Sequence, residues 1–94
     1  MVRDKISEEL RRGSCQDILD QIYIHSSGGK SKINTPGFIS SVSQKPNYNV
    51  SSVRRKIQKL EELGLISEET ANKLILEKGA VNYVSKSIRR TLSK

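Results

Sequence analysis

The sequence predicts a mainly α-helical fold that carries one small β-hairpin. In several short segments apolar residues recur every three or four positions, which is typical of amphipathic helices packed on a shared core. Residues 65–66 and 74–76 form two short apolar runs separated by polar residues, which could be two strands joined by a turn, although local signals there slightly favour a helix. At 94 residues the chain has room for one compact domain only.

An N-terminal helical arm is predicted over residues 1–13. Apolar residues recur there at every fourth position before the break at Gly13, and they are Val2, Ile6 and Leu10. The same apolar residues could instead help to bury a surface of a second copy of the chain.

Two further helices are predicted before the middle of the chain. Ser14 can cap the first of them, which should run to about His25. Residues 26–34 are rich in Gly, Ser and Lys and are predicted to be a loop. Thr35 can cap the next helix, with Pro36 at the first helical position. The inward residues should be Ile18, Leu19, Ile22 and Tyr23 in the first helix and Phe38, Ile39 and Val42 in the second.

Residues 49–63 form the most informative segment. It follows a proline-bearing turn, and Asn49 or Ser51 can cap it. Its acidic residues come only at its C-terminal end, an order that opposes the helix dipole and that a phosphate partner would explain. The alternative is an ordinary basic surface helix without a ligand. The predicted inward stripe is Val50, Val53, Ile57 and Leu60, and the outward set is Ser51, Ser52, Arg54, Arg55, Gln58 and Lys59.

The segment after this helix has two interpretations. Gly64 is predicted to end the helix in the left-handed conformation. Residues 65–66 would then begin a strand and residues 74–76 would form the return strand. The competing interpretation is a helix capped by Ser67, and local signals alone slightly favour that helix over residues 67–76.

The run KLEELGLISEETANKLILEKG resembles the recognition-helix end and hairpin of winged helix-turn-helix regulators of the PadR, MarR and ArsR kind. The resemblance covers the chain from about residue 14 to the end. It implies a DNA-binding domain over residues 14–76 with a hairpin wing, followed by a C-terminal dimerisation helix over residues 77–94. Two departures are an extra N-terminal helix and a short acidic wing with Lys73 as its only base. The matching residues are Leu60, Glu61, Glu62, Gly64, Leu65, Ile66, Leu76, Lys78 and Gly79.

A homodimer is expected from the C-terminal segment and from the small apolar content of the chain. Residues 78–92 are predicted to form one helix with a narrow apolar seam, which a second copy could cover across a two-fold axis. The alternative is that the seam packs back on its own domain. The predicted dimer interface is Val81, Val84, Ile88 and Leu92.

The charge balance favours a nucleic-acid partner. Seventeen Lys and Arg against ten Asp and Glu give a net charge of +7. The predicted function is sequence-specific binding of double-stranded DNA by a homodimer on a palindromic site, as a transcriptional regulator and in particular a repressor. A segregation adaptor that spreads from a plasmid or chromosomal centromere and recruits partner proteins is the alternative, and a module that binds protein or RNA is a third possibility. The residues predicted to contact phosphates are Lys30, Lys32, Lys45, Tyr48, Asn49 and Lys73.

Other functional classes find little support in the sequence. The single Cys15 and single His25 cannot build a disulfide or a metal site with residues of their own kind, so no metal or cofactor is expected. The Gly29-Lys30-Ser31 triplet lacks the earlier glycine of a phosphate-binding loop, because Ile24 stands there. No apolar run is long enough for a membrane span, and a cytoplasmic protein without enzymatic activity is expected.

Overall fold

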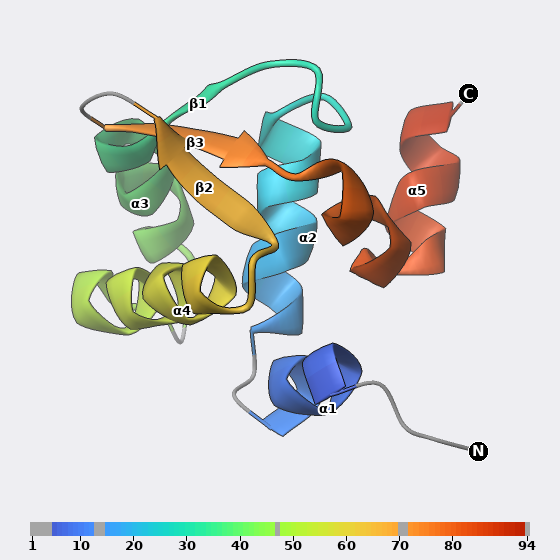
Figure 1. Ribbon diagram of the computed structural model, residues 1–94. Coiled ribbons are helices and arrows are strands. Elements are labelled where there is room, and N and C mark those ends of the chain that lie inside the picture. Colours follow the sequence, from blue (N-terminus) through green and yellow to red (C-terminus); the bar gives the residue numbers. More distant parts are fainter. Residues whose placement is uncertain (1–4, 13–14, 47, 70–71, 94) are drawn as a thin grey trace.

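The computed structural model describes residues 5–12, 15–46, 48–69 and 72–93. The described fold is mostly helical with a small three-stranded antiparallel sheet, which confirms the predicted fold class at this level. Figure 1 shows the strands crossing one side of a cluster of helices. In chain order the elements are α1 (Lys5–Arg12), α2 (Gln16–His25), β1 (Ile33–Asn34), α3 (Thr35–Ser43), α4 (Val50–Glu62), β2 (Ile66–Glu69), β3 (Lys73–Leu76), a 3-10 helix η1 (Lys78–Tyr83) and α5 (Lys86–Ser93).

The first helix, α1, packs on the core of the domain. Leu10 of α1 is only 1% exposed, and Ile6 is partly buried against the same cluster. The backbone N–H of Cys15 donates to the carbonyl of Leu10 at 3.0 Å, which ties the end of α1 to the start of α2. The predicted positions Val2, Gly13 and Ser14 lie outside the described residues.

Helix α2 buries the four apolar residues predicted for it. The segment after it contains a short strand, β1, that the sequence analysis assigned to a loop. Ile33 and Asn34 pair with Leu74 and Lys73 of β3. A two-residue strand has no periodicity of its own, so only its distant partner defines it.

The cap of α3 is Asn34 and not the predicted Thr35. The Asn34 side-chain oxygen accepts from the backbone N–H of Gly37 at 2.9 Å, while Thr35 is already helical and donates its own N–H to the carbonyl of Asn72. Pro36 still lies in the first turn, where its missing N–H is harmless. Phe38, Ile39 and Val42 are buried as predicted.

Helix α4 begins at the predicted cap. The Asn49 side-chain oxygen accepts from the backbone N–H of Ser52 at 2.8 Å. Val53, Ile57 and Leu60 are buried, but Val50 is 46% exposed, against the prediction, because the first residue of the helix lies at the open groove beside α3. Gly64 has φ +77° and therefore ends the helix segment as predicted.

Residues 66–69 and 73–76 form two antiparallel strands and not a helix. In the β2–β3 pair Ile66 lies opposite Leu76 and Glu69 opposite Lys73, and β1 extends the sheet in the order β1-β3-β2. Ile66, Leu74 and Leu76 are all buried on one face of this sheet. In β3 the buried Leu74 and Leu76 alternate with the more exposed Lys73 and Ile75, which is the period-two pattern of a strand with one face on a core.

The C-terminal segment is broken in two, which corrects the prediction of one helix over residues 78–92. The 3-10 helix η1 ends before Val84, and α5 begins after Ser85. Asp20 of α2 causes this break, because its carboxylate accepts from the Ser85 backbone N–H at 3.0 Å and from the Ser85 hydroxyl at 2.6 Å. Asp20 is buried, and the N-terminal end of a helix is a favourable place for its charge.

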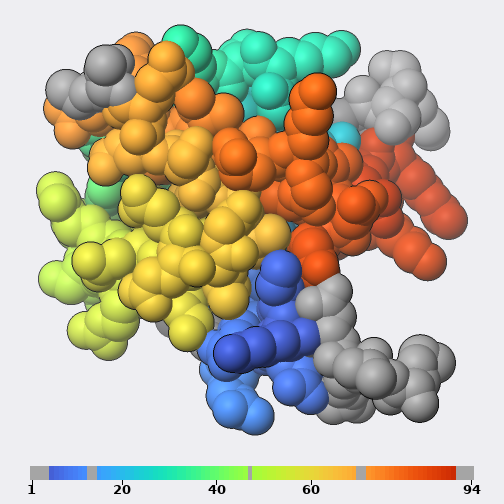
Figure 2. Space-filling model, viewed as in Figure 1, coloured from blue at the N-terminus to red at the C-terminus, as the bar shows by residue number. Residues whose placement is uncertain are grey.

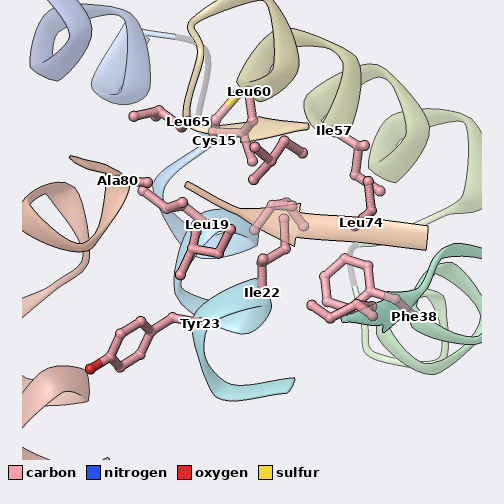
Figure 3. Close-up of a cluster of buried hydrophobic side chains, with 14 of the residues drawn as sticks. Cys15, Leu19, Ile22, Tyr23, Phe38, Ile57, Leu60, Leu65, Leu74 and Ala80 are labelled. Atoms are coloured by element: carbon pink, nitrogen blue, oxygen red, sulfur yellow. The ribbon is translucent and has the colours of Figure 1, made fainter. Parts of the chain in front are cut away.

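One hydrophobic cluster joins all these elements (Figure 3). Helices α2, α3 and α4 each contribute at least three buried side chains, and the buried face of the sheet lies against them. Cys15 is buried in this cluster next to residues of α4, and its burial raises the pKa of its thiol. Because α4 is packed on this core, the elements that lie beside its outer side chains are fixed as well.

Candidate nucleic-acid interface

The candidate interface centres on the outer side of α4. Ser51, Arg54, Arg55 and Gln58 are exposed, as predicted, while Ser52 and Lys59 are half-buried. The first ten residues of α4 contain no acidic residue, and Glu61 and Glu62 come last. Hydroxyl, amide and guanidinium groups of this kind bond base edges and phosphates in a major groove.

The turn before α4 is fixed by Tyr48. Its hydroxyl donates to an Asp17 carboxylate oxygen at 3.1 Å, and the Lys56 Nζ lies 5.6 Å from the centre of its ring. Partial burial, followed by the bond to Asp17, raises the pKa of Tyr48. Because this hydroxyl already has an acceptor within the protein, the predicted phosphate contact by Tyr48 is not supported, and the residue serves to position the turn.

One flank of α4 faces the hairpin. A groove of about 350 Å³ lies there, and Arg54, Gln58 and Glu61 of α4 line it together with Glu68 of β2. The spacing of Arg54, Gln58 and Glu61 is helical, so the three side chains form one row. This flank therefore mixes one cation and one amide with two carboxylates.

The other flank of α4 faces the junction of α1 and α2 and is basic. A hollow of about 260 Å³ is lined by Ser52, Arg55, Lys56 and Lys59, with Cys15 at its inner side. Figure 2 shows the side chains of α1, in blue, meeting those of α4, in yellow, along this edge of the molecule. Of the six residues predicted as one reading face, Arg54 and Gln58 thus lie on the hairpin flank, and Ser52, Arg55 and Lys59 lie on the basic flank.

A carboxylate from α1 reaches the basic flank. Glu9 lies 2.9 Å from the Lys59 Nζ, and the two side chains are 24% and 38% exposed. The hydrogen bond and charge of Lys59 lower the pKa of Glu9, and the same contacts from Glu9 raise the pKa of Lys59. The sequence analysis missed Glu9 because only the packing of α1 places it there.

The residues predicted to contact phosphates lie in several places. Lys30 and Lys45 are exposed in turns, and Lys73 is exposed on β3. Lys32 forms an ion pair with Glu69 of the hairpin at 2.9 Å. Asn49 uses its side-chain oxygen to cap α4. The structure therefore does not gather this set into one patch.

The predicted dimer seam is largely part of the core. Val84 is 3% exposed, and Val81 and Ile88 are partly buried against the same cluster. These residues follow the alternative given above, in which the seam packs back on its own domain. The side chain of Leu92 lies outside the described residues.

A polar contact that was not predicted from the sequence joins α2 to η1. The Gln16 amide donates to Asp20 at 3.0 Å and to the Tyr83 carbonyl at 2.8 Å. The signal was present, because Gln16, Asp20 and Tyr23 follow helical spacing on one face of α2. A charged residue on that apolar face indicates a buried partner.

Metal sites and membrane-spanning helices can be judged only in the described part of the chain. Within it, no three His, Cys, Asp or Glu side chains are grouped to hold a metal ion, and no helix has the length and apolar character needed to cross a membrane. No protein-family model matches the chain, and neither a curated protein nor a solved structure matches it.

Proposed function

We propose that this protein is a winged helix-turn-helix protein that binds double-stranded DNA in a sequence-specific manner. The proposal rests on the arrangement of α3, a capped turn and α4, with the hairpin beside α4. The outer side of α4 is cationic, and the first ten residues of α4 contain no acidic residue. In this docking α4 enters the major groove, and Ser51, Arg54 and Gln58 contact base edges.

A homodimer on a palindromic site completes the proposal, with transcriptional repression as the role. One short helix reads only a few base pairs, and two helices related by a two-fold axis read two half-sites about one DNA turn apart, roughly 34 Å.

Selection of bound sequences from a random duplex pool at about 0.15 M salt tests the proposal, since phosphate-only binding is weak there. Enrichment of an inverted repeat is expected. On the enriched site, Arg54→Ala and Gln58→Ala should each reduce the preference for it by about 1–3 kcal/mol. Lys73→Ala, on the hairpin, is the control and should leave the preference unchanged. An unenriched pool would refute sequence-specific binding and leave shape-only DNA binding, RNA or a protein as the partner.

A segregation adaptor is the second candidate, and the distribution of charge on the molecule supports it. Glu68 and Glu69 are exposed on the hairpin, whereas Lys86 and Arg90 are exposed on α5 at the other side of the molecule (Figure 1). Surfaces of opposite charge on one protomer suit head-to-tail contacts, which extend along DNA without closing. Protection of DNA that grows outward from the selected site as protein concentration rises would favour this role over a single bound dimer.

A further inference from the structure

The basic flank of α4 carries an inference about how DNA is held. It rests on the proposed function and names the part of the protein that receives the phosphate backbone. We propose that the hollow lined by Ser52, Arg55, Lys56 and Lys59 binds a DNA phosphodiester, and that the Glu9 carboxylate is paired with Lys59 of this hollow when DNA is absent.

The hollow is lined mainly by residues that carry cationic groups. Three cationic side chains and one hydroxyl from successive turns of α4 line a hollow of about 260 Å³. A phosphodiester is a single negative charge with several acceptor oxygens, and Arg, Lys and Ser are the side chains that commonly bond it. Lys56 is held in place by its contact with the Tyr48 ring, so part of the hollow is preorganised.

The second argument is that an anion already binds at this place. The Glu9 carboxylate contacts Lys59 at 2.9 Å from the α1 side. A carboxylate and a phosphodiester present similar oxygen acceptors to an ammonium group. Glu9 therefore marks a position that an external phosphate can take, and it competes with that phosphate.

The third argument is the contrast between the two flanks of α4. The hairpin flank carries Glu61 and Glu68 beside Arg54, and the nearby Lys32 is paired with Glu69. A polyanionic backbone is repelled where carboxylates are exposed and attracted where cations exceed them. The phosphates next to the reading helix should therefore lie on the side of α1 and α2, and the hairpin should contribute less to affinity.

The test compares two substitutions that each remove one negative charge. Glu9→Gln frees Lys59 from its carboxylate partner, and Glu68→Gln makes the same change on the opposite flank. Affinity for the selected duplex is measured by fluorescence anisotropy over a range of salt concentrations. Glu9→Gln should increase the affinity for the duplex by up to about fivefold and make that affinity depend more steeply on salt. Glu68→Gln should change the affinity and its salt dependence less. A gain of affinity cannot arise from a failure to fold.

Loss variants provide the second arm. Arg55→Ala should weaken binding to the selected site and to unrelated duplexes by similar factors, and should reduce the slope of log affinity against log salt by about 0.9. Replacing single phosphates of the duplex with neutral methylphosphonates should identify one position at which wild-type affinity falls and Arg55→Ala affinity does not. Such a position would assign the hollow to the DNA backbone and not to a free phosphate compound.

The failure of this inference differs from the failure of the proposed function. If the wild-type protein binds no duplex, the proposed function falls and the phosphate site with it. If the duplex is bound but Glu68→Gln tightens binding more than Glu9→Gln, the backbone lies on the hairpin side and only the phosphate assignment is wrong. If Arg55→Ala changes sequence preference with no change in salt slope, Arg55 contacts bases and the assignment is also wrong.

Discussion

The buried carboxylate of Asp20 gives the sharpest prediction about stability. It accepts from Gln16 at 3.0 Å and from the backbone N–H and hydroxyl of Ser85 at 3.0 and 2.6 Å. Asp20→Ala removes the acceptor and leaves both Ser85 donors without this partner, whereas the Gln16 amide keeps its bond to the Tyr83 carbonyl. The loss should therefore come mainly from the connection between α2 and α5.

The size of the effect follows from these contacts. A donor that loses a buried partner costs about 1–3 kcal/mol, and both Ser85 donors are only part-buried, so about 2–3 kcal/mol in total is expected. That is a large share of the 5–15 kcal/mol typical of a small domain. Asp20→Asn keeps an acceptor for the Ser85 N–H and should cost about 1 kcal/mol.

Urea unfolding followed by circular dichroism measures this effect. The Asp20→Ala midpoint should fall by about 1 M or more, given the usual dependence of unfolding free energy on urea. Asp17→Ala is the control on the same helix, because Asp17 is exposed; it removes the acceptor of the exposed Tyr48 hydroxyl and should cost about 1 kcal/mol or less. A double-mutant cycle with Ser85→Ala should show coupling. Equal midpoints for the Asp20→Ala and Asp17→Ala variants would refute the proposed role of Asp20.

Three further predictions concern α4 and its ends. Gly64→Ala should destabilise the protein by about 1 kcal/mol in thermal unfolding, because φ is +77° there although the space beside it is open; an unchanged midpoint would contradict this. Ile57 is buried and Val50 is 46% exposed, so Ile57→Ala should cost about 2–5 kcal/mol and Val50→Ala about 0.5 kcal/mol or less. Similar losses of unfolding free energy for the two variants, measured in urea, would contradict the burial argument. The pKa of Glu9 is lowered, so this carboxylate contributes stability above pH 4.5, the ordinary pKa of the group, and the contribution is lost as the pH falls through the folded-state pKa. The pKa of Lys59 is raised, so the contribution of Lys59 is present below pH 10.5 and is lost as the pH rises through its folded-state pKa. The stability difference between wild type and Glu9→Gln should therefore be largest between these pH values, and a difference that does not vary with pH would exclude the ion pair as its source.

Local sequence signals predicted the helices that define the candidate interface. The inward stripes of α2, α3 and the later turns of α4 are buried as expected, because apolar spacing is a local property. The Asn49 cap and the Gly64 stop were likewise readable, since each depends on the chemistry of one residue.

The errors arose where distant residues decide the local structure. Strand β1 exists because Ile33 and Asn34 meet β3, and the same sheet makes residues 66–69 and 73–76 paired strands although local signals slightly favoured a helix. The break before α5 depends on Asp20, which lies far away in the chain. No window of sequence around Ser85 contains that carboxylate.

The candidate site was only partly predictable for the same reason. Helical spacing placed Ser52, Arg55 and Gln58 on the outer side of α4, but it could not separate the basic flank from the hairpin flank. That separation depends on which elements pack on either side, namely α1 with Glu9 and β2 with Glu68. Which flank of α4 can attract an anion therefore depends on the elements packed beside it.

The exposed side of α5 sets a condition on any dimer of this protein. Val84 is in the core, so a two-fold contact through α5 would have to use its outer side, where Lys86 and Arg90 are exposed. Like charges facing each other across a two-fold axis oppose association, and salt screens this repulsion. A dimer through α5 should consequently become tighter as salt rises, whereas a head-to-tail contact between α5 and the acidic hairpin should become weaker. Sedimentation at low and high salt distinguishes the two, and a self-association that does not depend on salt would exclude the charged side of α5 from either contact.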